Sequence, residues 1–282
     1  MIRKLVIGLT SVAVVIALLA LLLPTILHKA GLHPEYTGDT VELPGKRALV
    51  ITTSHGTLNA PGETDGKATG VFASEMTVPY YTFLDGGMQV DIASIQGGEI
   101  PIDPESFFYA VRTPEDERYL QDAVVQAKVK NSLRIDDIDF TRYDIIFMAG
   151  GWGAAYDLGY SDVLGRKVSE AYYDSSAVIG GVCHGVLGLI KAEDKDGNLL
   201  IAGRRMTGVS DKQIKELGIE ITPQHPETEL RKAGAKYEKQ TAFRDIFATH
   251  VVVDDERRFV TGQNQNSGYD TAHQMMAVVA ER

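Results

Sequence analysis

The residues with the clearest potential for chemistry surround Cys183, the one cysteine of the sequence. The segment Gly180-Gly181-Val182-Cys183-His184-Gly185 follows a short apolar run and precedes a helical pattern. A thiol at such a strand-to-helix turn is the cysteine version of a nucleophile elbow, where a sharp turn exposes the side chain. The unpaired N–H groups of a helix start favour a thiolate and a developing oxyanion, so we expect a lowered thiol pKa. The alternative is a buried structural cysteine beside an unrelated histidine.

Two other segments carry candidate site residues. The segment Gly66 to Glu75 enters a helix and places Glu75 about one turn inside it. A carboxyl group on an otherwise apolar turn either pairs with another group or has a raised pKa, whereas a solvated helix carboxylate is the alternative. The segment Ala149-Gly150-Gly151-Trp152-Gly153 follows a predicted strand, at the sheet edge where doubly wound proteins bind ligands; a plain turn is the alternative. It lacks the full G-x-G-x-x-G spacing of a dinucleotide site.

The elements around these segments predict an α/β fold with a doubly wound, mostly parallel sheet between layers of helices. Apolar runs predict strands at 48–53, 88–95, 144–149 and 177–182, and helical periodicity predicts helices at 70–84, 114–130 and 162–173. Further along we expect a hairpin turn at 196–198, a short helix at 226–233, a strand pair from 250 and a terminal helix at 271–280. Nothing in the pattern indicates repeats or a second domain.

The amino-terminal segment differs from the rest. From Leu5 to Leu27 the chain has 23 residues without a charge, which as a helix would measure about 34 Å. We therefore expect a retained membrane anchor at 1–30, a linker at 31–46 that contains Pro34, Gly38 and Pro44, and the α/β domain at 47–282. The basic residues before the apolar run predict a single-pass protein with the domain on the extracytoplasmic side.

Composition excludes several classes of protein. The first 34 residues hold three basic and no acidic side chains, so the remainder has 28 − 3 = 25 basic against 38 acidic ones, a net charge near −13. This acidity argues against nucleic-acid binding. With 44% hydrophobic and 23% charged residues the chain is not disordered. One cysteine excludes an internal disulfide framework and any multi-cysteine zinc or iron–sulfur site.

Taken together, these motifs resemble the ThiJ/PfpI superfamily, and in particular its branch of heat-shock chaperones and glyoxalase III proteins. The resemblance runs from about Arg47 to Val279 and implies a flavodoxin-like sandwich of the class I glutamine-amidotransferase type. The motifs that carry it are G-K-x-T-G-x-x-x-x-E ending at Glu75, Pro79-Tyr80-Tyr81-Thr82-Phe83, Val90-Asp91-Ile92-Ala93-Ser94, Gly97-Gly98, Ala149-Gly150-Gly151, Val182-Cys183-His184-Gly185 and Phe259-Val260-Thr261-Gly262-Gln263-Asn264.

The resemblance implies roles for individual residues. Cys183 would be the nucleophile with His184 beside it, and Glu75 the acid that hydrogen-bonds the thiol. The turn Gly150-Gly151 would form the oxyanion and substrate pocket, with Gly151 offering its backbone N–H.

This chain departs from the family pattern at two places. Trp152 stands where the family turn often has histidine. The position at which related chains carry a third triad acid is Ile214, which leaves the nearby Asp211 as a candidate to orient His184.

The leading functional hypothesis is a cofactor-free enzyme that converts reactive 2-oxoaldehydes of the methylglyoxal kind to 2-hydroxy acids, with a stress-protective role. We expect no metal and no nucleic-acid partner, and a small carbonyl or amide as substrate; a homodimer is left open. Three alternatives remain at this point: a cysteine peptidase or amidase, a glutaminase subunit of an amidotransferase, and a chaperone or oxidation sensor without turnover.

Overall fold

The core of the molecule is a seven-stranded sheet with the strand order β10-β11-β7-β6-β1-β4-β5. We describe residues 2–282 from a computed structural model, with side chains described from residue 13 onward. The strands of this sheet are β1 (Arg47–Thr52), β4 (Gln89–Ser94), β5 (Leu133–Arg134), β6 (Ile145–Met148), β7 (Val178–Val182), β10 (Val251–Val253) and β11 (Phe259–Gly262). Every neighbouring pair is parallel except β10 with β11. Two small sheets pair β2 (Thr57–Leu58) with β3 (Lys67–Ala68), and β8 (Arg205–Met206) with β9 (Lys236–Tyr237).

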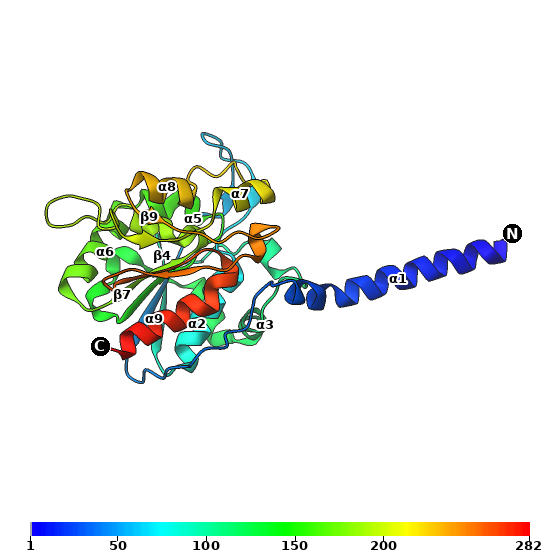
Figure 1. Ribbon diagram of the computed structural model, residues 1–282, viewed down its shortest axis with the longest axis horizontal. Helices are drawn as coiled ribbons and strands as arrows, with labels where there is room; N and C mark the ends of the chain where they lie inside the picture. The colour runs from blue at the N-terminus through cyan, green and yellow to red at the C-terminus, as the bar shows by residue number, and fades with distance from the viewer. Residues whose placement is uncertain (1) are drawn as a thin grey trace.

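Helices cover both faces of the sheet (Figure 1). The helices of the described chain are α1 (Ile2–Lys29), α2 (Ala73–Asp85), α3 (Pro114–Gln121), α4 (Ala123–Lys130), α5 (Ala154–Asp157), α6 (Asp162–Asp174), α7 (Asp211–Leu217), α8 (Pro226–Lys232) and α9 (Gly268–Ala280), of which α1 does not cover the sheet. Short 3₁₀ turns lie at Pro104–Phe107, Ile135–Asp137, Phe140–Arg142, Leu158–Tyr160, Cys183–Leu189, Asp245–Phe247 and Gln265–Ser267.

Alternate residues of the central strands enter two separate cores. Val50 and Phe147 pack on the side of α2, α4 and α9, whereas Ile51 and Ile146 pack on the side of α5, α6 and α8. Because both faces are buried, the strands are apolar throughout, which is the pattern from which a parallel sheet was expected. The carboxyl ends of β1, β6 and β7 meet at one edge, where the candidate site lies.

Two predicted helices differ from the structure. The helix expected at 114–130 divides into α3 and α4 at Asp122, whose carboxylate accepts hydrogen bonds from the N–H groups of Val124 and Val125 and so begins a new helix. The helix expected after Cys183 is a 3₁₀ helix, Cys183–Leu189.

The predicted transmembrane helix requires a correction. Figure 1 shows α1 leading away from the body of the domain. Within the residues that were described, no helix is long and apolar enough to cross a membrane. The described part of α1 also contains Pro24, which has no backbone N–H to donate within the helix. Residues 5–12 of the predicted span lie outside the described side chains. The predicted anchor at 5–27 is therefore wrong, and so is the predicted single-pass location with the domain outside.

The segment 31–46, expected to be a linker, packs on the domain. Leu32 and Leu43 are buried. The ring of Tyr36 stacks on that of His273 in α9, with 4.0 Å between centroids, and the N–H of Leu43 donates to the carbonyl of Gly86 at the end of α2. This segment therefore forms part of the folded body.

Candidate active site

Cys183 occupies the elbow that its sequence context predicts. The buried strand β7 ends at Val182, and Cys183 follows with φ +56°, a conformation that is uncommon for a residue with a side chain. Glycine is required within β7, three residues before Cys183. A Cβ on Gly180 would lie 1.7 Å from the carbonyl oxygen of Val260 in the neighbouring strand. The Cys183 side chain is 4% exposed and lines a cavity of about 390 Å³.

Glu75 and the Gly150-Gly151 turn lie at the same cavity. Glu75 is in the first turn of α2, is 2% exposed, and its Oε2 has no hydrogen-bond partner among the described residues. The N–H of Phe72 donates to the carbonyl of Gly150 at 3.4 Å, which fastens the start of α2 to this turn. A Cβ on Gly150 would approach Glu75 Oε2 to 2.4 Å, so the carboxyl group lies directly against the turn. The solvated alternative for Glu75 is therefore wrong.

Burial dominates the titration of this pair. It raises the pKa of Glu75 to about 8, against the lowering effect of contacts with the Cys183 side chain and with the backbone N–H groups of Gly150 and Gly151. Burial also raises the pKa of the Cys183 thiol, and a negative charge on Glu75 adds to this, whereas the N–H groups of His184 and Gly151 act in the opposite direction. Glu75 is thus protonated near neutral pH. The lowered thiol pKa expected from the sequence is therefore wrong, because burial raises the pKa of Cys183.

His184 lies between the thiol and an aromatic wall. Its Nδ1 is 3.5 Å from Cys183 Sγ, and the Trp152 ring meets the imidazole edge-on with 5.2 Å between centroids. Burial lowers the pKa of His184 to about 3, with a further lowering from nearby His225, so the ring is neutral. Its Nε2 has no hydrogen-bond partner among the described residues. Trp152, which stands where the family often has histidine, therefore packs against the candidate base.

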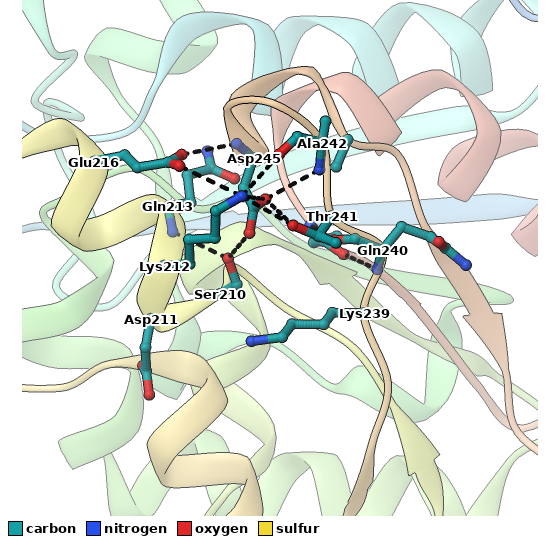
Figure 2. Close-up of polar contacts among 12 residues, drawn as sticks. Ser210, Asp211, Lys212, Gln213, Glu216, Lys239, Gln240, Thr241, Ala242 and Asp245 are labelled. Carbon is teal, nitrogen blue, oxygen red and sulfur yellow. Dashed lines mark hydrogen bonds and ion pairs between the residues drawn. The ribbon is translucent and has the colours of Figure 1, made fainter.

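No hydrogen bond or ion pair joins Asp211 to His184. Asp211 is the first residue of α7; its carboxylate accepts from the Thr228 hydroxyl at 2.9 Å, and its N–H donates to Glu227 at 3.0 Å. Figure 2 shows its side chain pointing away from the polar cluster formed by its neighbours. Ile214, at the position of the family's third acid, is fully buried. Asp211 therefore joins the start of α7 to α8.

The polar cluster in Figure 2 centres on Asp245 and fastens α7 to the loop at 240–248. Its carboxylate accepts from Ser210 Oγ at 2.7 Å, Lys212 Nζ at 2.6 Å and Thr241 Oγ1 at 2.7 Å. Although burial raises it, these hydrogen bonds, that from Lys212 above all, lower the pKa of Asp245 to about 2. The cluster holds in place two elements that supply walls of the Cys183 cavity.

Those walls contain residues that sequence reasoning did not find. The cavity is lined by Phe72, Glu75, Asp103, Glu105, Phe108, Val111, Gly151, Trp152, Cys183, Gln213, Leu217, Ile246 and Gln265. Three of these side chains are carboxyls, and none of the lining residues described is Lys or Arg. Most of the unforeseen ones lie in loops or short helices without periodicity, so only the tertiary structure brings them together. In the described part of the chain, no three His, Cys, Asp or Glu side chains gather in a way that could hold a metal ion.

Fold and site together define a class: a doubly wound α/β protein with a strained cysteine on the elbow after a central strand, beside a buried protonated carboxyl group. Comparison with known families agrees, since the DJ-1/PfpI family matches residues 67–278, and the chain belongs to that family.

Similar proteins share most of the chain. "Glyoxalase 3" of Candida albicans is 29% identical over an alignment of 242 positions, and the match covers 82% of this chain and 97% of that protein. "Glutathione-independent glyoxalase HSP31" of Saccharomyces cerevisiae is 28% identical and covers 80% of this chain and 95% of its own length. Among solved structures, glyoxalase III from Candida albicans has a TM-score of 0.72 at 27% identity, covering 83% and 97% of the two chains. Rapid Encystment Protein 24 KDa of Francisella tularensis has a TM-score of 0.75 at 33% identity, covering 83% and 99%.

Proposed function

We propose that this protein is a glutathione-independent glyoxalase of the glyoxalase III type, which converts 2-oxoaldehydes to 2-hydroxy acids with Cys183 as nucleophile. The observation that carries the proposal is the Glu75 carboxyl group, buried, protonated and unpartnered at Oε2, in the same cavity as the Cys183 thiol. The relatives named as glyoxalases cover four-fifths of the chain and support an enzyme of this type.

The first step is addition of the thiol to the aldehyde carbon. As the C–S bond forms, neutral His184 accepts the thiol proton at Nδ1, which lies 3.5 Å from Sγ, and the negative charge that Glu75 acquires in the same step offsets the lowered pKa of the imidazole. The aldehyde oxygen becomes an oxyanion next to the Gly150-Gly151 turn, and Glu75 gives it a proton. The product is a hemithioacetal beside a Glu75 carboxylate.

The second step moves one proton between adjacent carbons. The Glu75 carboxylate takes the proton from the sulfur-bearing carbon, which leaves an enediolate, and returns it to the neighbouring carbon. The hydroxyl proton passes between the two oxygens, so the product is a thioester with an adjacent hydroxyl group. Water then attacks the thioester: its oxygen joins the acyl carbon, one proton returns to Glu75, and the sulfur leaves with the proton held by His184. The sum is addition of water to the 2-oxoaldehyde, with no redox partner.

The peptidase or amidase alternative receives less support from the site. An amide hydrolase of this kind relies on a histidine that a third group orients. Here no described residue binds His184 Nε2, and Asp211 is engaged with Thr228 and Glu227.

Incubation of the purified full chain with methylglyoxal, without added glutathione, tests the proposal when lactate is followed by NMR. A peptide library incubated in parallel reports hydrolysis. Lactate without peptide fragments is the expected outcome. Fragments without lactate would favour a hydrolase, and neither product would favour a chaperone or sensor.

A further inference from the structure

The residues that follow α1 make direct contacts with two loops of the candidate active site. The N–H of Gly31 donates to the carbonyl of His28 and that of Leu32 to Leu27, so this segment continues directly from the helix. Leu32 is buried, and His33 has φ +49°, a left-handed conformation that bends the chain onto the domain. An ordinary linker would need neither feature.

Asn266 ties this segment to the loop that contains Ile246. It is 2% exposed and uses its whole side-chain amide. Its Oδ1 accepts from the N–H of His33 at 2.8 Å, while Nδ2 donates to the carbonyl oxygens of Gly31 at 2.7 Å and Ile246 at 2.8 Å. One amide therefore joins 31–33 to a wall of the Cys183 cavity.

His33 ties the same segment to a second wall. Its Nε2 lies 2.8 Å from the carbonyl oxygen of Val111, and a carbonyl only accepts, so this nitrogen carries the proton. Burial lowers the pKa of His33 to about 4, which keeps the ring neutral under ordinary conditions. Nearby, the Tyr109 hydroxyl donates to the carbonyl of Ala20 in α1 at 3.0 Å.

Val111 and Ile246 belong to different loops, and both line the cavity that contains Cys183. We propose that His33 and Asn266 form a positioning clamp, which binds the segment 31–33 to both walls. The clamp sets the separation of the two walls and thereby the access of bulky substrates to Cys183. The amino-terminal segment is then part of the substrate pocket's support. Neither clamp residue touches the reacting atoms; both act through the loops that they hold.

The single cysteine allows a test that does not depend on the substrate. Labelling of Cys183 is measured with a small reagent, iodoacetamide, and with a bulky one, N-(1-pyrenyl)maleimide, on the full chain. In His33→Ala the bond to Val111 is lost and the loop is less restrained. Since one neutral hydrogen bond changes an equilibrium by about 2- to 10-fold, we expect the bulky-to-small ratio of labelling rates to rise by about that factor.

Two further variants separate positioning from general damage. His33→Gln keeps a donor that can reach the Val111 carbonyl and should restore a ratio near that of the wild type. Tyr36→Ala removes a contact of the same segment with His273, which does not line the cavity, and should leave the ratio unchanged. Melting temperatures are recorded for all variants, so that loss of folding is recognised.

The result that would overturn the clamp is a bulky-to-small ratio in His33→Ala equal to that of the wild type, or a ratio that rises equally in Tyr36→Ala. Turnover adds a second readout that rests on the proposed function: His33→Ala should raise kcat/KM for the bulky phenylglyoxal relative to that for methylglyoxal. If no 2-oxoaldehyde is converted while the labelling ratio changes as expected, the proposed function fails and the clamp stands. Normal turnover with an unchanged labelling ratio would overturn the clamp and leave the proposed function standing.

Discussion

Glu75 and Cys183 occupy one buried cavity, and their protonation states determine what the site can do. The Glu75 carboxyl group is held neutral by burial and lies against the turn that would meet the substrate oxygen. A neutral carboxyl group can donate a proton and, once it has done so, can accept another from carbon.

Glu75→Gln should leave Cys183 open to iodoacetamide and reduce turnover of methylglyoxal by about 10²-fold or more, because glutamine keeps the shape but cannot transfer a proton. Cys183→Ala is the control and should lose both labelling and turnover. Near wild-type turnover in Glu75→Gln on every 2-oxoaldehyde tried would exclude Glu75 as the proton carrier.

The raised pKa of Glu75 also predicts how stability depends on pH. The folded protein holds this proton up to about pH 8, whereas an unfolded chain releases it near the ordinary glutamate value of about 4.3. The contribution of the Glu75 proton to the free energy of unfolding is therefore fully present below about pH 4.3 and is lost as pH rises through 8. Denaturant unfolding at pH 5 and pH 9 should show Glu75→Gln gaining stability relative to the wild type at the higher pH. A constant difference across this range would mean that Glu75 is ionised in the folded protein.

Charge at the pocket predicts selectivity among substrates. Asp103 and Glu105 line the cavity beside the neutral Glu75, and no Lys or Arg is among the lining residues described. Because the acidic wall repels a second negative charge, we expect kcat/KM for phenylglyoxal to exceed that for 4-carboxyphenylglyoxal. Glu105→Gln should reduce the ratio of the two kcat/KM values by about fivefold, the effect of one charge contact in water. Added salt should narrow it in the wild type and have less effect in the variant. A gap that neither change alters would show that the acidic wall does not select the substrate.

At the scale of elements, the glycines of β7 allow the elbow to form. A Cβ on Gly180 would meet the backbone of β11, so Gly180→Ala should destabilise the fold by about 3 kcal/mol or more, since a strand would have to move. Gly268→Ala is the matched control: its Cβ would make ordinary contacts with Val78, and in helix α9 it should be neutral or slightly stabilising. Denaturant unfolding of the two variants measures the difference; equal midpoints would contradict the account of β7.

Helices and strands differ in how well the sequence could predict them. The central strands were predictable because burial on both faces makes them continuously apolar, and the elbow was predictable because strand, glycines and thiol are adjacent in the chain. The division of 114–130 was not foreseen, since the capping role of Asp122 is visible only in the folded chain. Helix α7 was missed because Asp211–Leu217 is too short for periodicity to identify. The placement of Asp211 depends on how α7 packs against α8, the next helix along the chain, whose Glu227 and Thr228 bind it.

At the scale of the whole molecule, the site is assembled by loops that meet at the carboxyl edge of the sheet, and the amino-terminal segment joins them. Val111, Ile246 and Gln265 were not foreseen as pocket residues, because they come from three separate loops or turns and share no motif. The segment 31–46 was mistaken for a linker because its Pro and Gly content is typical of one, although Leu32, Tyr36 and Leu43 pack on the domain. Composition alone does not distinguish a linker from a segment that packs along a surface.

The most direct test of the central claim uses the single cysteine of the full chain. The protein is alkylated with iodoacetamide to increasing extents, the modified fraction of Cys183 is measured by mass spectrometry, and lactate formation from methylglyoxal without glutathione is followed on each sample. The account predicts that activity falls in proportion to the alkylated fraction and reaches zero at full modification, and that methylglyoxal slows the alkylation. Fully alkylated protein that still forms lactate at the wild-type rate would contradict it.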